Sequence, residues 1–367
     1  MSDEVLKVFP EFSRKVDDGW MMEAWGLAKE TGIPLEKWPE GEPLRQAARL
    51  VSALGADRLS RAMHWRNWRS DREDPARYYQ SLFTRVRGAT GFRYLSEIDG
   101  FLARHPDMDV SHRADLLSFQ GTILSGHRDF APAFRKLHEA LELVPDDSWL
   151  HVEHARALNT ADRYEEALAA AKRAVELKPT YRAAVHVCAE TLVHLGKDDE
   201  ALKLVEDAHR ISPQASFAAM LQTYHSERGE PLQALGYLDD FEKCSPLMEE
   251  PLKKWLSGRR ADFFLMSGDL DGYERHAEDA GKGFHRKALE KLDRSGSRVM
   301  LPVPFVRQHR STCGPATLAA ISAYWGEDHD HLAIADSICH DGTPWHKERR
   351  WAEDSGFVTR EFRLTRD

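Results

Sequence analysis

The sequence predicts a mainly α-helical chain, in which a long solenoid of paired helices precedes a smaller domain that mixes helices with strands. Three observations support this prediction. Small residues and prolines recur every 34 residues in the middle of the chain, apolar residues follow helical spacing elsewhere, and short apolar runs near the C-terminus have the composition of strands. We expect a helical cap at 1–74, the solenoid at 75–280, a helix and linker at 281–298, and the last domain at 299–367.

Composition and charge indicate a soluble globular protein. The chain has 367 residues, of which 42% are hydrophobic and 30% are charged, and it is long enough to bury a sizeable core. The formal net charge of -9 argues against a general nucleic-acid binder. The N-terminus lacks the features of a secretion signal, and no run approaches the roughly 20 apolar residues of a membrane span. Four widely spaced cysteines indicate reduced thiols, so we expect a cytoplasmic location.

Helical runs separated by short breaks fill the first part of the chain. We expect helices at Val5–Trp25, Leu44–Leu54 and Asp57–Arg69, with a proline-containing loop at Gly32–Glu42. Apolar residues of the first run recur at helical spacing and predict core packing: Trp20, Met21, Trp25 and Leu27. Because a stack of helix pairs buries its apolar faces only against neighbours, these irregular helices are expected to cap the stack.

The second part of the chain begins with a helix pair, which is followed by a sequence repeat of constant period. The pair is predicted at 76–87 and 92–105, with Pro106 as the stop. Small residues, leucines and prolines then recur in register: Gly121, Ala155 and Ala189; Ala133, Ala167 and Ala201; Ala140, Ala174 and Ala208; Leu124, Leu158 and Leu192; Pro145, Pro179 and Pro213. A fourth unit with Ala234 and Pro246 has lost one residue, and a divergent fifth unit places its helices at 250–266 and 270–280.

This period and pattern resemble those of tetratricopeptide repeats. Small residues let the two antiparallel helices of a unit approach closely, and proline ends the second helix. The resemblance implies five or six helix pairs wound into a right-handed superhelix with a concave face, which would bind a peptide or protein partner.

By analogy with that family, the concave face would be lined by residues on the first helix of each unit: Ser118, Thr122, Val152, Arg156, Asn159, His186 and Glu190. Arg156 with Asn159 could hold a carboxylate, because guanidinium and amide donors match its two oxygens. The alternative is a peptide groove without a specific carboxylate site. The lysine-and-asparagine clamp of some relatives is missing.

Other clusters of charged or metal-ligating residues have structural interpretations. His151 and His154 lie three residues apart on one helix, a spacing that can share a metal, but they occupy packing positions of the repeat. Asp328–His331 and Cys339–His340 are expected to be a solvated loop and a helix cap. The arginine-rich stretch 61–77 is expected to be a solvated helix face with its tryptophans in the core. We therefore predict no metal and no cofactor.

The last part is predicted to alternate strands with helices. Residues 299–307 and 358–364 have strand character, and Pro302 and Pro304 suit the first to a sheet edge. Helices are expected after Cys313, over 332–339, and from 345 to 355.

Cys313 has the position of a reactive thiol. A cysteine that begins a helix lies beside unpaired backbone N–H groups and the positive end of the helix dipole, which favour the thiolate. Gln308, five residues upstream, supplies a side-chain donor of the kind that an oxyanion hole requires. Cys188 and Cys244 instead fall at helix positions that predict small core residues.

The segment resembles the bacteriocin-processing, double-glycine leader branch of the papain-like cysteine peptidases. The matching features are the strand-like run with Gln308, the Cys313–Ala316 motif opening an apolar helix, and weaker likeness at 341–343, 351–353 and 356–357. The resemblance implies that Cys313 is the nucleophile and Gln308 the oxyanion donor. In that family the general-base histidine lies further downstream, and none of His329, His331, His340 and His346 has its sequence context. We therefore expect a last domain that is truncated or a degenerate half.

Two functions follow from the sequence. In the first, repeats present a peptide to a papain-like cysteine peptidase domain in which Cys313 attacks a backbone carbonyl. In the second, the protein is a non-catalytic interaction adaptor whose last domain only recognises a peptide.

Overall fold

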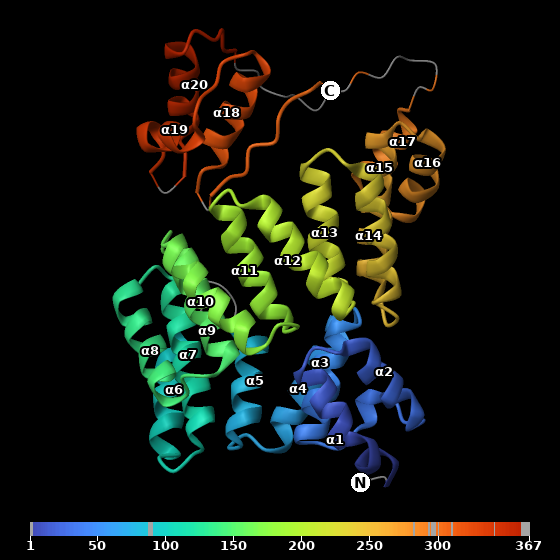
Figure 1. The fold of residues 1–367 in the computed structure, drawn as a ribbon, viewed down its shortest axis with the longest axis vertical. Helices are drawn as coiled ribbons and strands as arrows, with labels where there is room; N and C mark the ends of the chain where they lie inside the picture. The colour runs from blue at the N-terminus through green and yellow to red at the C-terminus, as the bar shows by residue number, and fades with distance from the viewer. Residues whose placement is uncertain are drawn as a thin grey trace. The chain divides into compact units, whose positions relative to one another are not determined.

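The computed structural model describes residues 3–86, 91–281, 283–292, 294, 299, 301–309, 311–340 and 342–360. The chain forms two compact units, Met1–Lys291 and Leu292–Asp367. Within the described residues all regular structure is helical, with twenty α-helices and one 3₁₀ helix (Figure 1). None of these helices is long and apolar enough to cross a membrane. The mainly α-helical fold class is therefore confirmed.

The N-terminal helices are α1 (Asp3–Asp17), α2 (Met21–Glu30), the 3₁₀ helix η1 (Leu35–Lys37), α3 (Glu42–Ala53) and α4 (Asp57–Ser70). The first predicted run is two helices rather than one, because Gly19 at φ 86° turns the chain between them. Phe12 and Trp38 are fully buried at the centre of this unit's own core, with ring centroids 4.6 Å apart.

Helix pairs follow in the order that the repeat predicts. Their bounds are α5 (Pro75–Arg85), α6 (Arg93–Arg104), α7 (Val110–Gly126), α8 (Phe130–Leu143), α9 (Ser148–Thr160), α10 (Tyr164–Leu177), α11 (Arg182–His194), α12 (Asp198–Ile211), α13 (Ala215–Glu227), α14 (Pro231–Lys243), α15 (Glu250–Ser267), α16 (Leu270–Asp279) and α17 (Phe284–Glu290). The two helices of each pair from α7 to α16 pack on each other, and α7, α9, α11 and α13 pack in succession (Figure 1).

The small residues of the repeat lie where helices approach most closely. A Cβ atom at Gly121 would lie 2.6 Å from Leu137 Cγ on α8, so only glycine fits that contact. The equivalent Ala155 and Ala189 are fully buried in one continuous core with Ala174 and Ala201. Close packing of the pair thus depends on the same positions that carry the sequence period.

The N-terminal helices contact several repeats, not only the first. Their hydrogen bonds reach the loops that join the second helix of one repeat to the first helix of the next: Thr180 Oγ1 to Asp18 O at 2.7 Å, Ser212 Oγ to Gly19 O at 2.9 Å, and Leu247 N to Leu54 O at 3.0 Å. Met22 also packs against the core that contains Phe241 and Cys244. The first 70 residues therefore lie along the loops of the solenoid as well as before its first repeat.

The second unit contains α18 (Cys313–Tyr324), α19 (His331–Ile338) and α20 (Trp345–Asp354) around Ala319, Ile334 and Ile338. The helix predictions for this part are confirmed, whereas the strand predictions are wrong where the structure describes them. Residues 301–309 and 357–360 form no strand. Two prolines remove backbone donors from the first segment, and neither segment has a partner strand among the described residues. The positions 361–364 of the second predicted strand, and Asp341, lie outside the described residues.

Candidate functional site

Two candidate sites follow from the sequence: the concave face of the repeats and the Cys313 thiol. On the concave face, Arg156 of α9 keeps 43% of its side-chain surface exposed and pairs with Glu153, which is buried, at 2.7 Å. Its guanidinium also lies 5.2 Å from the centroid of the Trp149 ring. Arg156 is thus held in place by a carboxylate below it and an aromatic ring beside it.

Asn159 lies on the same helix but is engaged elsewhere. Its Nδ2 donates to Thr191 Oγ1 on α11 at 2.9 Å, so the amide joins two neighbouring repeats. A ligand carboxylate bound by both Arg156 and Asn159 would have to displace this interaction. The structure does not bring the two donors together as a free pair.

His186 and Glu190 lie one turn apart on α11, and both side chains are about half exposed, with His186 Nδ1 4.0 Å from Glu190 Oε2. Desolvation lowers the pKa of His186, and the Arg156 and Arg182 charges lower it further. Desolvation raises the pKa of Glu190, against the opposing effect of Arg156. Both side chains are accessible to a partner, and both shifts have desolvation as their largest cause.

Two residues expected in the groove are buried instead, so that prediction is wrong for Ser118 and Val152. Ser118 Oγ donates to the Asp115 carbonyl within its own helix. Thr122 Oγ1 hydrogen-bonds the buried carboxylate of Glu153. The Thr122–Glu153 hydrogen bond links α7 to α9, which contact each other.

An aromatic cluster that includes Trp149 was not anticipated from the sequence. Phe83 is 47% exposed and makes edge contacts with Phe119 at 5.0 Å and Trp149 at 6.1 Å between centroids. Trp149 Nε1 donates to Tyr79 Oη at 2.7 Å, which fixes the indole. A hollow of about 470 Å³ opens beside Phe83 and Phe119. The sequence feature that could have indicated this cluster was the presence of aromatic residues in the segments that form α5, α7 and α9.

The thiol site has part of the geometry that nucleophilic chemistry needs. Cys313 is exposed and is the first residue of α18, as predicted. Gln308 is exposed in the preceding segment. Among the described histidines, none hydrogen-bonds the thiol. The ring of His329 contacts Trp351 and that of His331 contacts His309.

The other ligand-rich residues have structural roles. Asp330 caps α19 by accepting from the Leu332 and Ala333 amides, as expected for a cap. Burial lowers the pKa of His154 to about 4, with neighbouring His138 and His151 adding to the shift. No group of three His, Cys, Asp or Glu side chains within the described part of the chain could hold a metal.

Cys188 and Cys244 are buried, as predicted, and burial raises the pKa of each thiol to about 11. Cys313 and Cys339 retain solvent contact. Cys339 Sγ donates to the Ser311 carbonyl at 3.0 Å, which leaves Cys313 as the more accessible thiol.

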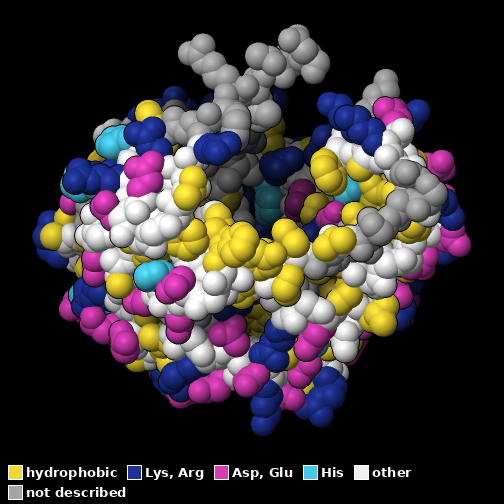
Figure 2. Space-filling view, turned by 90° about the horizontal axis from the view of Figure 1, so that it is seen from above, with side chains coloured by type: hydrophobic (Ala, Val, Ile, Leu, Met, Phe, Trp, Pro, Cys, Tyr) yellow, Lys and Arg dark blue, Asp and Glu magenta, His cyan; other side chains and the backbone are white. Residues whose placement is uncertain are grey.

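The tryptophans of the arginine-rich stretch are partly exposed rather than core. Trp65 is 38% exposed and packs against Trp68. Arg69 lies over Trp65 and Arg72 over Trp68. Figure 2 shows acidic and basic side chains intermingled on the face that it draws.

Comparisons with known proteins agree with the repeats. The tetratricopeptide repeat family profile matches residues 158–223, which lie within α9–α13. The chain is 32% identical over 94 residues to the Protein STIP1 homolog of Dictyostelium discoideum, covering 26% of this chain and 17% of that protein. It is 24% identical over 129 residues to the Small glutamine-rich tetratricopeptide repeat-containing protein 2 of Saccharomyces cerevisiae, covering 35% of this chain and 37% of that protein.

Among solved structures, partial likeness extends to the Cut9–Hcn1 hetero-tetramer of the APC/C (TM-score 0.48, 14% identity, 90% of this chain and 58% of that chain). Another is the structure of Pseudomonas aeruginosa pilF (TM-score 0.44, 14% identity, 60% of this chain and 96% of that chain). The chain contains tetratricopeptide repeats, and it spans less than two fifths of either sequence relative. The match at 158–223 does not reach the C-terminal unit.

Proposed function

We propose that this protein is an interaction adaptor that binds a peptide segment of a partner protein along α7, α9 and α11. The supporting observation is a continuous row of accessible side chains of changing chemistry: Phe83 contacts Trp149, Arg156 lies over Trp149, and the Arg156 charge acts on His186 and Glu190. A row that joins an aromatic hollow to charged groups suits an extended peptide with an apolar anchor followed by polar residues. Repeats supply such concave surfaces by their stacking.

The apolar anchor is expected to occupy the hollow of about 470 Å³ beside Phe83 and Phe119. An exposed aromatic ring gains most from a partner that removes its surface from water. Binding should therefore depend on Phe83 more than on any exposed apolar residue outside the concave face.

Selection from a random peptide library against the full chain tests this proposal. Selected peptides would be titrated against the wild type, Phe83→Ala and the control Leu232→Ala, whose leucine is 67% exposed on α14. We expect Phe83→Ala to weaken binding about tenfold or more and Leu232→Ala to leave it within about twofold. Equal affinities for the three proteins, or no selectable peptide, would contradict the proposal.

A second candidate function is cysteine peptidase chemistry, which one observation favours. Cys313 is solvent-exposed at the first residue of α18, where a substrate could reach its sulfur. We propose that it attacks a peptide carbonyl with Gln308 as oxyanion donor. Among the described residues, no histidine lies beside the thiol to act as the general base.

Thiol labelling distinguishes the two candidates. Iodoacetamide at pH 6 should modify Cys313 several times faster than Cys339 if the nucleophile is poised, and a Cys313→Ser variant should abolish the fast phase. Equal, slow labelling of both thiols would leave the adaptor proposal standing and remove the peptidase proposal. Loss of peptide binding in Phe83→Ala with slow labelling of Cys313 would support an adaptor alone.

A further inference from the structure

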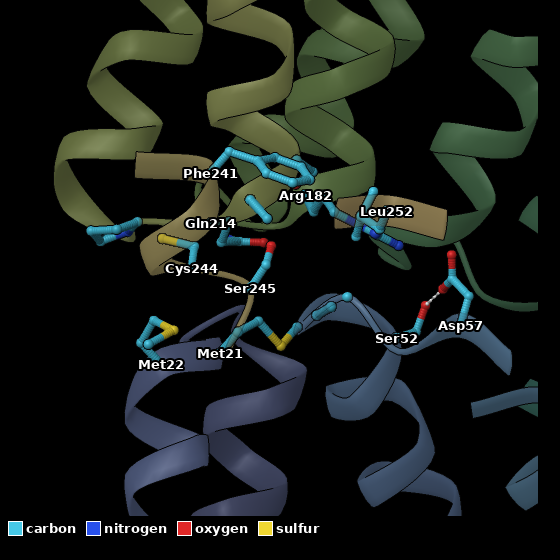
Figure 3. A pocket seen from close by; sticks show the side chains of 15 residues that line it. Met21, Met22, Ser52, Asp57, Arg182, Gln214, Phe241, Cys244, Ser245 and Leu252 are labelled. Atoms are coloured by element: carbon cyan, nitrogen blue, oxygen red, sulfur yellow. Dashed lines mark hydrogen bonds between the residues drawn. The ribbon is translucent and has the colours of Figure 1, made fainter. Parts of the chain in front are cut away.

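A small cavity, open to solvent on one side, lies where the N-terminal helices meet the loops of the repeats. Its volume is about 190 Å³. Met21 and Met22 of α2 and the α3–α4 turn form one wall, and the starts of α11, α13 and α15 with the end of α14 form the other (Figure 3). The lining residues used below are Met21, Ser52, Asp57, Arg182, Ser216, Phe241, Ser245 and Leu252.

Two hydroxyl groups in this lining lack partners. Ser216 Oγ and Ser245 Oγ are both buried and have no hydrogen-bond partner in the described part of the protein. A buried hydroxyl without a partner is unfavourable by about 1–3 kcal/mol, so native proteins leave few of them. Each hydroxyl could donate a hydrogen bond to a molecule in the cavity or accept one from it.

Arg182 places a positive charge at the solvent-exposed rim of the same cavity. It is the first residue of α11, and it forms no salt bridge or side-chain hydrogen bond with another described residue. Desolvation lowers the pKa of Arg182, Tyr181 opposes this shift, and the Arg156 and Arg49 charges add to it. The Asp57 charge raises the pKa of Arg182. The Asp57 carboxylate itself accepts a hydrogen bond from Ser52 at 2.6 Å. Figure 3 shows Arg182 on the repeat side of the cavity, above Met21 and Ser52.

We propose that this cavity binds a small organic anion with a carboxylate at one end and an apolar body. The Arg182 guanidinium would pair with the carboxylate, and the two serine hydroxyls would donate to its oxygens. Met21, Phe241 and Leu252 would cover the apolar body. An apolar cavity of about 150 Å³ is known to hold benzene, so the volume of about 190 Å³ here suits a monocarboxylate of about eight or nine non-hydrogen atoms.

Such a ligand would touch both the N-terminal helices and the repeats. Because it would bind only where the two walls are apposed, it would stabilise their contact by mass action. Arg182 opens the helix that also carries His186 and Glu190, so occupancy of the cavity would order one end of the peptide-binding helix. The proposal does not depend on which peptide the groove binds.

Isothermal titration of the full chain with matched probes tests the site. Benzoate and hexanoate are the anionic probes, and benzamide and 1-hexanol are their neutral counterparts of similar size. We expect saturable binding of the anions and at least tenfold weaker binding of the neutral probes. Methyl signals of Met21 and Met22 should shift with the anions, while those of methionines outside the cavity should not.

Variants test whether Arg182 supplies the positive charge that binds the anion. Arg182→Gln should weaken benzoate binding at least tenfold, whereas Arg210→Gln, an exposed arginine on α12, should not change it. Ser245→Ala should weaken binding several-fold and provides a second test should Arg182→Gln not fold. Equal binding of benzoate and benzamide, unchanged affinity in Arg182→Gln, or no saturable binding of either anion would overturn the proposal.

Discussion

Single residues show how far sequence reasoning reaches. Gly121 could be predicted as a point of close helix approach, because the period places alanine at the equivalent positions. The position of Cys313 at the start of α18 followed from the Cys-Gly-Pro motif, whereas its exposure was not predicted. The engagement of Asn159 by Thr191 did not follow, because it depends on which side chain the next repeat places opposite. The local sequence pattern determines where two helix backbones approach closely, whereas the partner of a given side chain depends on tertiary contacts.

At the scale of single residues, the pKa of Asp115 predicts how the unfolding free energy depends on pH. Burial and the nearby Asp147 charge raise its pKa to about 7, against the effect of Arg45. Between its unfolded pKa near 4 and this value the folded state holds the extra proton, so the contribution of Asp115 to unfolding free energy falls as pH rises. Asp115→Asn should therefore be more stable than the wild type at pH 8, by on the order of 2 kcal/mol.

Urea unfolding of both proteins at pH 4 and pH 8 measures this difference. The comparison isolates Asp115, since His64 and His154, with pKa values lowered to about 4, contribute pH dependence of the opposite sign in both proteins. A stability difference that does not change between the two pH values would show that Asp115 ionises normally in the folded state.

At the scale of elements, helix predictions succeeded where caps and stops were explicit. The repeats, α19 and α20 all agree with the expected ranges to within a few residues, because their turn residues and apolar spacing are local. The break at Gly19 was missed, and so was the absence of strands at 301–309. A strand exists only with a partner, and composition alone cannot supply one.

At the scale of elements, the testable prediction concerns the effect of Gly19 on stability. Its φ of 86° disfavours other residues, and a Cβ there would lie 2.7 Å from the Thr180 carbonyl oxygen in the α10–α11 loop. Gly19→Ala should reduce the free energy of unfolding by more than about 1 kcal/mol, because it adds a clash to the backbone strain.

Gly196→Ala is the matched control, since Gly196 has φ 70° and open space where its Cβ would lie. Denaturant unfolding of the two variants should show the larger loss for Gly19→Ala. Equal losses would mean that strain alone acts at Gly19 and that the contact with Thr180 relaxes without penalty.

At the scale of the whole molecule, the chain divides into two compact units between Lys291 and Leu292, and the domain bounds expected from the sequence stay a prediction. The sequence did not predict that the N-terminal helices would contact loops as distant as that of Leu247. Such contacts join surfaces that carry no periodic signal. The small cavity and the Arg182 charge at its rim arise there, and for that reason neither could be seen in the sequence.

Removal of residues 1–70 tests the role of these contacts. The truncated protein should lose Met22 from the core around Phe241 and Cys244 and expose that apolar surface. We expect a melting temperature lower by several degrees and increased binding of a hydrophobic dye, compared with the full chain. An unchanged melting temperature would show that the repeats from α7 onward are stable without the N-terminal helices.

The hydrogen bonds from Thr180 to Asp18 and from Ser212 to Gly19 have a consequence for folding kinetics. They join residues 162 and 193 positions apart, whereas a simple repeat stack has only neighbour contacts and can start folding at any unit. Closing such long loops is entropically unfavourable and slow, so the repeats should assemble first and the N-terminal helices should join them in a later, rate-limiting step.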